Sequence, residues 1–136
     1  MADVFTQAKR SQVMALIRSR DTKPELAVRR SLHRLGYRFR LHDRRLPGRP
    51  DIVLKKHRLI IEVKGCFWHS HRCLNGRLPV GNSAYWSAKL ARNQQRDRWK
   101  ARLWRGMGWR VATIWECDVR RMTAERLALR LNRLFG

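Results

Sequence analysis

Two short apolar runs, DIVL at 51–54 and LIIEV at 59–63, lie four residues apart in the middle of the chain. Short apolar runs rich in valine and isoleucine are typical of buried strands. The connection KKHR at 55–58 is short, so the two runs predict one β-hairpin. This hairpin is the centre around which the other elements are assigned.

Helices and further strands are expected on both sides of the hairpin. Thr22 and Glu25 have the spacing of a capping box and Pro24 falls in the first turn, so a helix is expected at 23–35. Other helices are expected at 6–20, 83–105 and 123–135, strands at 37–41 and 109–115, and a loop at 74–82. This order predicts an α/β fold in which one mixed sheet is flanked by helices. A chain of 136 residues fits a single domain.

The charge of the chain restricts its partners. Lysine and arginine number 32 against 10 acidic residues, a formal net charge of +22. Such an excess usually has a polyanionic partner, and nucleic acid is the first candidate. A membrane surface is a weaker candidate, because the arginines are spread along the whole chain. The N-terminus MADVFTQAKRSQ has no apolar centre like that of a signal peptide, and no run approaches the roughly 18 apolar residues of a membrane span, so we expect a cytoplasmic protein without a membrane partner.

Two carboxylates and a lysine occur at the ends of the central strands. Asp51 opens the first strand, and Glu62 and Lys64, two residues apart on the second, project from one face. In a hairpin Asp51 can lie beside them. Two carboxylates with a backbone carbonyl can hold Mg²⁺, which clamps a phosphate and lowers the pKa of a bound water, while a lysine can orient that water or offset charge. The set predicts phosphodiester hydrolysis; the alternative is a strand end with solvated polar side chains.

The three cysteines and one histidine have the pattern of a zinc site. Cys66, His71 and Cys73 lie within eight residues, and Cys117 follows the strand at 109–115. A Cys₃His set suits tetrahedral Zn²⁺, and four protein ligands would make the site structural. The alternative is three buried thiols and a surface histidine. His69 is left over, and is a candidate acid or base, phosphate contact, or fourth zinc ligand in place of His71.

Aromatic residues divide into two groups. Phe67 and Trp68 are adjacent, so at least one of them is expected to face away from the core. Phe67, Trp68 and Trp86 are expected to contact DNA as wedges between base pairs, and the alternative is that they are core residues. The other tryptophans are expected in the core: Trp99, Trp104, Trp109 and Trp115.

Four blocks, LPGRPD (46–51), GCFWHSHRC (65–73), YWSAKLARNQQRD (85–97) and WRVATIWEC (109–117), together resemble the very-short-patch-repair DNA mismatch endonucleases. The pair PD with ExK also resembles the restriction-endonuclease-like nucleases. The resemblance implies one restriction-endonuclease-like domain over 1–136, with a basic DNA-contacting helix within 1–20 and a catalytic core at 21–136. It implies a cytoplasmic, nucleoid-associated and Mg²⁺-dependent enzyme. Its substrate would be double-stranded DNA with a T·G mismatch left by deaminated 5-methylcytosine, nicked 5′ to the thymine.

The resemblance also implies roles by position. Asp51 would hold Mg²⁺ with the backbone carbonyl of Val63, and His69 would act on the attacking water. Support for the site would come from Glu25 and Asp97, and zinc would be held by Cys66, His71, Cys73 and Cys117. Contacts with DNA would come from Met14, Ile17, Phe67, Trp68, Trp86, Lys89 and Asn93. Mismatch-repair proteins and a repair polymerase are candidate partners, and a monomer is expected because a nick needs one active site.

The chain departs from this family at two positions. Relatives usually carry histidine where this chain has Lys64, and a non-acidic residue where it has Glu62. We expect Lys64 to act mainly as a fixed positive charge on the scissile phosphate and Glu62 to add a metal ligand, and both Lys64 and His69 stay candidates for control of the water. Two other functions are open: a restriction-like or structure-specific nuclease of the same fold, and a zinc-braced DNA-binding module without activity.

Overall fold

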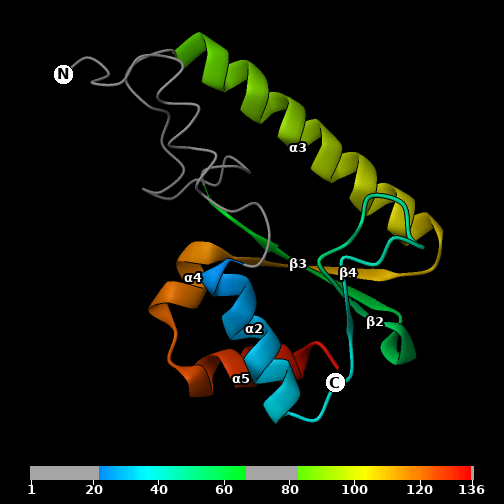
Figure 1. Ribbon diagram of the computed structural model, residues 1–136, viewed down its shortest axis with the longest axis vertical. Coiled ribbons are helices and arrows are strands. Elements are labelled where there is room, and N and C mark those ends of the chain that lie inside the picture. The colour runs from blue at the N-terminus through cyan, green and yellow to red at the C-terminus, as the bar shows by residue number, and fades with distance from the viewer. Residues whose placement is uncertain (1–21, 67–82, 136) are drawn as a thin grey trace.

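The computed structural model describes residues 22–66 and 83–135 (Figure 1). The helix expected at 6–20 and the loop expected at 74–82 lie outside the described residues. The same holds for seven residues singled out from the sequence: Met14, Ile17, Phe67, Trp68, His69, His71 and Cys73.

A four-stranded mixed sheet forms the middle layer, with strand order β1-β2-β3-β4. Its strands are β1 (Arg40–Leu41), β2 (Ile52–Leu54), β3 (Leu59–Lys64) and β4 (Arg110–Trp115). The expected hairpin is confirmed, because β2 and β3 pair antiparallel and are joined through a 3₁₀ turn at Lys55–His57. β4 then pairs parallel to β3, which makes the sheet mixed as expected.

The first strand is shorter than the one expected at 37–41. Only Arg40 and Leu41 pair with β2, which is itself three residues long and offers a short ladder. Tyr37 and Phe39 instead use their rings for packing. Tyr37 stacks on Phe135 and Phe39 stacks on His33, with ring centroids 3.7 and 4.7 Å apart.

Helices cover both faces of the sheet. On one side lie α2 (Lys23–Arg34), α4 (Glu116–Arg121) and α5 (Ala124–Arg133), and on the other lies α3 (Ser83–Gly106) (Figure 1). Successive strand residues point to opposite faces, so two cores form. The larger includes Val28 of α2, Ile61 of β3 and Leu131 of α5. The smaller, on the side of α3, consists of Val53, Ile60, Trp104 and Trp109.

The C-terminal helical region is split in two. A single helix is expected at 123–135, but α4 begins directly after β4, and α5 begins afresh after Thr123. The Thr123 hydroxyl accepts a hydrogen bond from the Arg126 N–H at 3.2 Å, the usual form of an N-cap. This cap explains why α5 starts where the sequence predicts, whereas α4 has no side-chain cap that would mark it.

One stripe of α3 faces inward along nearly its whole length. The stripe follows the helical spacing of four and three residues; its members are Trp86, Leu90, Asn93, Asp97, Lys100 and Trp104. Its ends are apolar and buried, while its middle is polar and half-buried. Trp99 falls off the stripe and is 55% exposed, so the core position expected for it is wrong, whereas Trp104 and Trp109 are buried as expected. Trp115 is half-buried.

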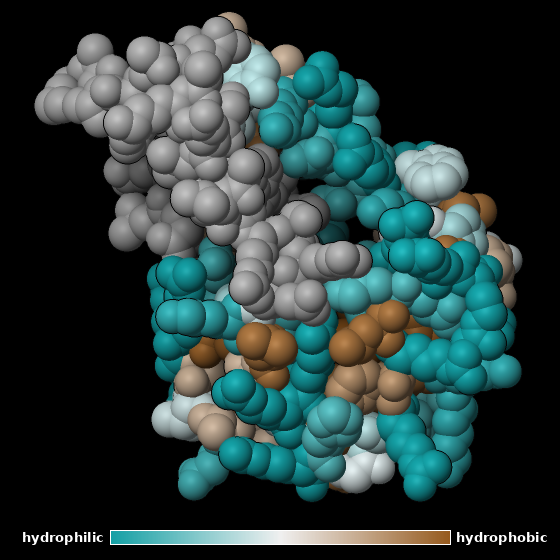
Figure 2. Space-filling view, in the orientation of Figure 1, coloured by the Kyte–Doolittle hydropathy of each residue, from teal (hydrophilic) through white to brown (hydrophobic). Residues whose placement is uncertain are grey.

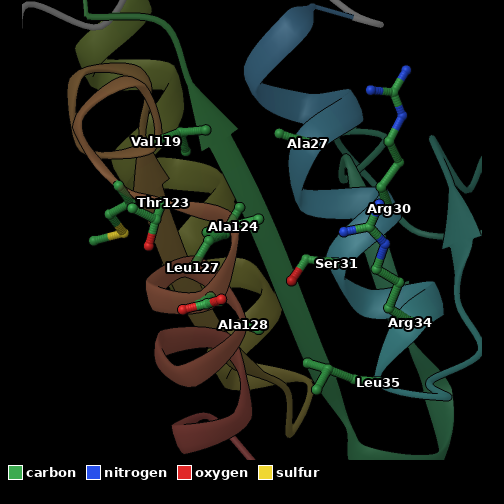
Figure 3. Close-up of a pocket in the computed structure, with 12 residues that line it drawn as sticks. Ala27, Arg30, Ser31, Arg34, Leu35, Val119, Thr123, Ala124, Leu127 and Ala128 are labelled. Atoms are coloured by element: carbon green, nitrogen blue, oxygen red, sulfur yellow. The ribbon is translucent and has the colours of Figure 1, made fainter.

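On the face that Figure 2 shows, most of the described surface is hydrophilic, in keeping with the net charge. The outer face of α3 exposes five arginines, Arg92, Arg96, Arg98, Arg102 and Arg105. A cavity of about 480 Å³ opens between α2 and α5, where Ala27, Leu35 and Leu127 are among the lining residues (Figure 3). None of the candidate catalytic residues lines it. No helix among the described residues is both long and apolar enough to cross a membrane.

Candidate active site

Asp51 and Glu62 meet where β2 begins and β3 ends. The antiparallel register pairs Ile52 with Ile61, so the next residues outward, Asp51 and Glu62, stand opposite each other. The Asp51 N–H donates to Glu62 Oε2 at 3.1 Å, and the Val63 N–H donates to Asp51 Oδ2 at 3.0 Å. Each carboxylate is therefore fixed by a backbone amide of the opposite chain segment. The hairpin brings the two acids side by side, as the sequence predicts.

The environment of Asp51 disfavours its ionised form. Burial is the largest cause, followed by the hydrogen bond and the negative charge of Glu62, and together they raise the pKa of Asp51 from its ordinary 3.8 to about 8. The Val63 N–H and the neighbouring His42 act in the opposite direction. Two crowded carboxylates of this kind are stabilised when a cation lies between them.

The donor set at this position fits magnesium. Mg²⁺ prefers oxygen ligands, and proteins usually supply one or two carboxylates while water and substrate phosphate fill the other positions. Asp51 and Glu62 provide two such carboxylates, half-buried and held in place. Among the described residues no group of three or more His, Cys, Asp or Glu side chains is placed to hold a metal ion.

Lys64 and Asp97 close the other side of this site. Lys64 Nζ lies 3.8 Å from Asp97 Oδ2, and both side chains are less than a fifth exposed. The Lys64 ammonium also lies 5.9 Å from the centroid of the Trp115 ring. Asp97 belongs to the polar middle of the α3 stripe, so the helix brings a carboxylate to the lysine at the end of β3. The structure therefore joins Glu62, Lys64 and Asp97 around one edge of the sheet.

Glu25 is buried on α2 and connects to Asp51 through two residues that sequence reasoning missed. Its side chain is bound by Arg29, whose Nη2 lies 3.0 Å from Glu25 Oε2. The same Nη2 lies 3.3 Å from His42 Nε2, and His42 Nδ1 lies 3.9 Å from Asp51 Oδ1. One hydrogen bond of the expected capping box is present, in which Thr22 Oγ1 accepts from the Glu25 N–H at 3.3 Å, and the Glu25 carboxylate also pairs with Arg29.

Nothing in the local sequence marks Arg29 or His42. The register between β1 and β2 is the feature that places His42 in the site. Leu41 pairs with Ile52, so His42 must fall opposite Asp51, and its N–H donates to the Asp51 carbonyl at 3.0 Å. Arg29 follows from helical spacing, because it stands four residues after Glu25 and can bind it on the same face of α2.

Two of the four expected zinc ligands are described. Cys66 and Cys117 are both buried, and neither forms a disulfide. Lys64 pairs with Trp115 in the parallel ladder, so each cysteine follows the last paired residue of its strand by two positions. The Cys66 N–H donates to Glu116 Oε1 at 3.3 Å, which ties these two segments together. His71 and Cys73 lie outside the described residues.

The expected DNA-contacting residues of α3 differ in exposure. The Trp86 side chain is 1% exposed, and Leu90, one turn further along α3, is also buried. Lys89 Nζ lies 5.6 Å from the Trp86 ring centroid, and Asn93 is half-buried. The DNA contacts proposed for Trp86, Lys89 and Asn93 stay predictions.

Known proteins resemble this chain over nearly its full length. Residues 2–75 match the family model described as DNA mismatch endonuclease Vsr. The type II nicking enzyme V.XorIIP of Xanthomonas oryzae pv. oryzae is 45% identical over 96% of both chains. The type II nicking enzyme V.NmeAIP of Neisseria meningitidis is 41% identical over 98% of this chain and 94% of its own. The DNA mismatch endonuclease Vsr of Escherichia coli is 40% identical over 97% of this chain and 86% of its own.

The first two of these likenesses cover 96% and 98% of this chain. They favour an enzyme over a DNA-binding module without activity. The chain belongs to the Vsr family of DNA mismatch endonucleases and is a DNA endonuclease.

Proposed function

We propose that this endonuclease nicks double-stranded DNA 5′ to the thymine of a T·G mismatch, by Mg²⁺-dependent hydrolysis of the phosphodiester. The observation that carries the proposal is the Asp51–Glu62 pair, two fixed carboxylates that crowd each other at one sheet edge. The names of the relatives support mismatch recognition and nicking. The Escherichia coli relative is called a mismatch endonuclease, and the Xanthomonas and Neisseria relatives are called nicking enzymes.

Asp51 and Glu62 would hold Mg²⁺, with the Val63 carbonyl as a further oxygen ligand. When bound, the ion would clamp the phosphate and lower the pKa of the attacking water. Lys64 keeps a positive charge near the phosphate, and Asp97 holds the lysine in place from α3. His69 and Lys64 are the two candidates for orienting the water. Glu25 acts from further away, through Arg29.

Cys66, His71, Cys73 and Cys117 would hold a structural Zn²⁺. Thiolates and imidazole are the ligands that zinc prefers. Support comes from Cys66 and Cys117, which are buried and follow the ends of two paired strands. The ion would join the segment after β3 to the start of α4, and would thereby brace the strand that carries Glu62 and Lys64.

DNA would lie against the basic surface, where the five exposed arginines of α3 are available for phosphate contacts. Phe67 and Trp68 would enter the base stack beside the mismatch, and Met14 and Ile17 would approach from the minor groove. Trp86 would enter the stack with Phe67 and Trp68, and Lys89 and Asn93 would contact the mismatched bases. Mismatch-repair proteins or a repair polymerase are the proposed protein partners of a monomeric enzyme.

A nicking assay tests the proposal. End-labelled duplexes that differ only in a central T·G, T·A or C·G pair are incubated with the protein and Mg²⁺, with Asp51→Ala as the blank. We expect one nick, 5′ to the thymine of the T·G duplex, which disappears in the variant and without Mg²⁺. Equal cleavage of the fully paired duplexes would contradict mismatch recognition and favour a restriction-like enzyme of the same fold.

A further inference from the structure

We infer that His42 is a positioning residue for Asp51, and that Arg29, held by Glu25, fixes the imidazole in the tautomer that this role requires. The inference rests on the proposed function, because it assumes that Asp51 takes part in the reaction. It adds two residues, Arg29 and His42, that neither the family resemblance nor the nuclease signature includes.

The direction of each contact follows from the chemistry of the groups. A guanidinium has only donors, so His42 Nε2, 3.3 Å from Arg29 Nη2, must be the acceptor. The ring N–H is therefore assigned to Nδ1, the nitrogen that faces Asp51.

The Nδ1–H is placed to orient the Asp51 carboxylate. The two atoms, His42 Nδ1 and Asp51 Oδ1, are 3.9 Å apart. Such contacts are often long before substrate binds and shorten in the complex. Asp51 Oδ2 is already bound by the Val63 N–H at 3.0 Å, so His42 approaches the other oxygen. One carboxylate would thus be held at both oxygens, which fixes its plane toward the ion and the phosphate.

The backbone supports the same role. His42 has φ +47°, in the left-handed region that non-glycine residues seldom occupy, although histidine is one of the types enriched there. Its N–H donates to the Asp51 carbonyl at 3.0 Å. Strained residues of this kind occur where function requires a particular side-chain position. The backbone hydrogen bond and the side-chain contact join the same two residues.

Arg29, which is bound by Glu25, contacts the nitrogen of the His42 ring that does not face Asp51. Glu25 is 1% exposed and its carboxylate needs a partner, which Arg29 provides. A single Arg29 nitrogen then contacts both the Glu25 carboxylate and the imidazole. If this pair served only to stabilise α2, the tautomer of His42 would not depend on it.

The tautomer can be measured without catalysis. We would label the histidines of the full chain with ¹⁵N and record their ring nitrogens at pH 8, identifying His42 by its loss in H42N. We expect Nδ1–H for His42 in the wild type, and a shift toward Nε2–H in Arg29→Met. Arg30→Met, an exposed arginine one residue along the same helix, should leave it unchanged. Nε2–H in the wild type would overturn the inference whether or not the Arg29 variant folds.

The rate of nicking tests positioning. His42→Gly removes the side chain and suits the positive φ, so its melting temperature should not fall. We expect a single-turnover rate about 10–100-fold lower at saturating T·G duplex, with unchanged DNA affinity, as for other outer-shell contacts. His42→Asn tolerates the backbone and offers an amide N–H near the place of Nδ1, so it should recover most of the rate.

A wild-type rate in H42G, or an H42N as slow as H42G, would overturn the inference. Nicking by the wild type and not by D51A keeps the proposed function intact in either case. If the wild type nicked no duplex, the proposed function would fail, and the tautomer of His42 in the wild type and the Arg29 variant would still decide whether Arg29 fixes the ring.

Discussion

Lys64 Nζ lies 3.8 Å from Asp97 Oδ2, so the last residue of β3 is joined to the inward face of α3. A carboxylate on α3, a helix distant in sequence from the hairpin, thereby holds the ammonium near the Asp51–Glu62 pair. A lysine that stabilises a phosphate transition state must be kept in one place, because its long side chain otherwise samples many rotamers.

Removal of this anchor should slow the reaction. In Asp97→Asn the lysine loses its charged partner, and we expect the single-turnover nicking rate to fall about 10–100-fold, the usual effect of an outer-shell change. DNA affinity should change little. The matched control is Glu125→Gln, the same change of charge at an exposed position of α5. An unaltered rate in D97N would show that Lys64 needs no anchor.

Glu62 should determine the requirement for magnesium. Glu62→Gln keeps the size of the side chain and an oxygen that can accept from the Asp51 N–H, but it removes one negative ligand. We expect the Mg²⁺ concentration for half-maximal rate to rise at least about tenfold, since fewer charged ligands weaken the binding of a divalent cation. Titration of the nicking rate with Mg²⁺ measures this. Equal midpoints would exclude Glu62 as a ligand.

The raised pKa of Asp51 predicts how stability depends on pH. Its folded value of about 8 exceeds its ordinary 3.8, so between these values the folded chain binds more protons than the unfolded chain. The contribution of Asp51 therefore lowers the free energy of unfolding as pH rises from about 4 to 8, and it is constant above that range.

Asp51→Asn removes this contribution. We expect the variant to be more stable than the wild type at pH 8 by at least about 1 kcal/mol, since each unit of carboxyl pKa is worth about 1.4 kcal/mol. The two proteins should converge toward pH 4. Urea unfolding at several pH values, without added divalent cation, gives the difference. A constant difference across this range would mean that Asp51 titrates normally.

The purified protein should contain zinc, and different substitutions should remove the zinc and the nicking activity. We expect about one zinc ion per purified chain, because four protein ligands complete a structural site. Cys117→Ser should lose the ion and unfold at a lower temperature, whereas Asp51→Ala should lose nicking and keep the ion. Metal analysis together with thermal unfolding checks both. Full zinc content in C117S would remove this cysteine from the ligand set.

The part of the site within one hairpin follows from the sequence, because its geometry is local. The connection at 55–58 leaves little freedom of register, and the register then determines that Asp51 meets Glu62. Asp97 reaches Lys64 from a helix whose inward stripe has regular spacing, and its supporting role is implied by the family resemblance. The middle of that stripe is polar, so apolar spacing alone does not reveal which face of α3 is covered. Without that face, the sequence gives no reason to place Trp99 outside the core, and the core position expected for it is wrong.

Arg29 and His42 could not be predicted in this way. His42 approaches Asp51 only because β1 pairs with β2 across the LPGRP turn, and β1 is two residues long, too short to give a pattern. In that turn Gly48 has φ +81°, and the Pro47 carbonyl accepts from Trp104 Nε1 at 2.7 Å. The position of the turn thus depends on a tryptophan more than fifty residues away, which no local pattern reveals.

The strand β3 has a further consequence for how this enzyme can evolve. Glu62 and Lys64 share one face of it, and two residues later Cys66 is tied to Glu116. An insertion or deletion of one residue before Lys64 would turn its side chain toward the other face and would also displace the cysteine. Descendants of this chain can therefore exchange side chains along the segment but not change its length. Alignments of its relatives should be free of gaps from Glu62 to Cys66.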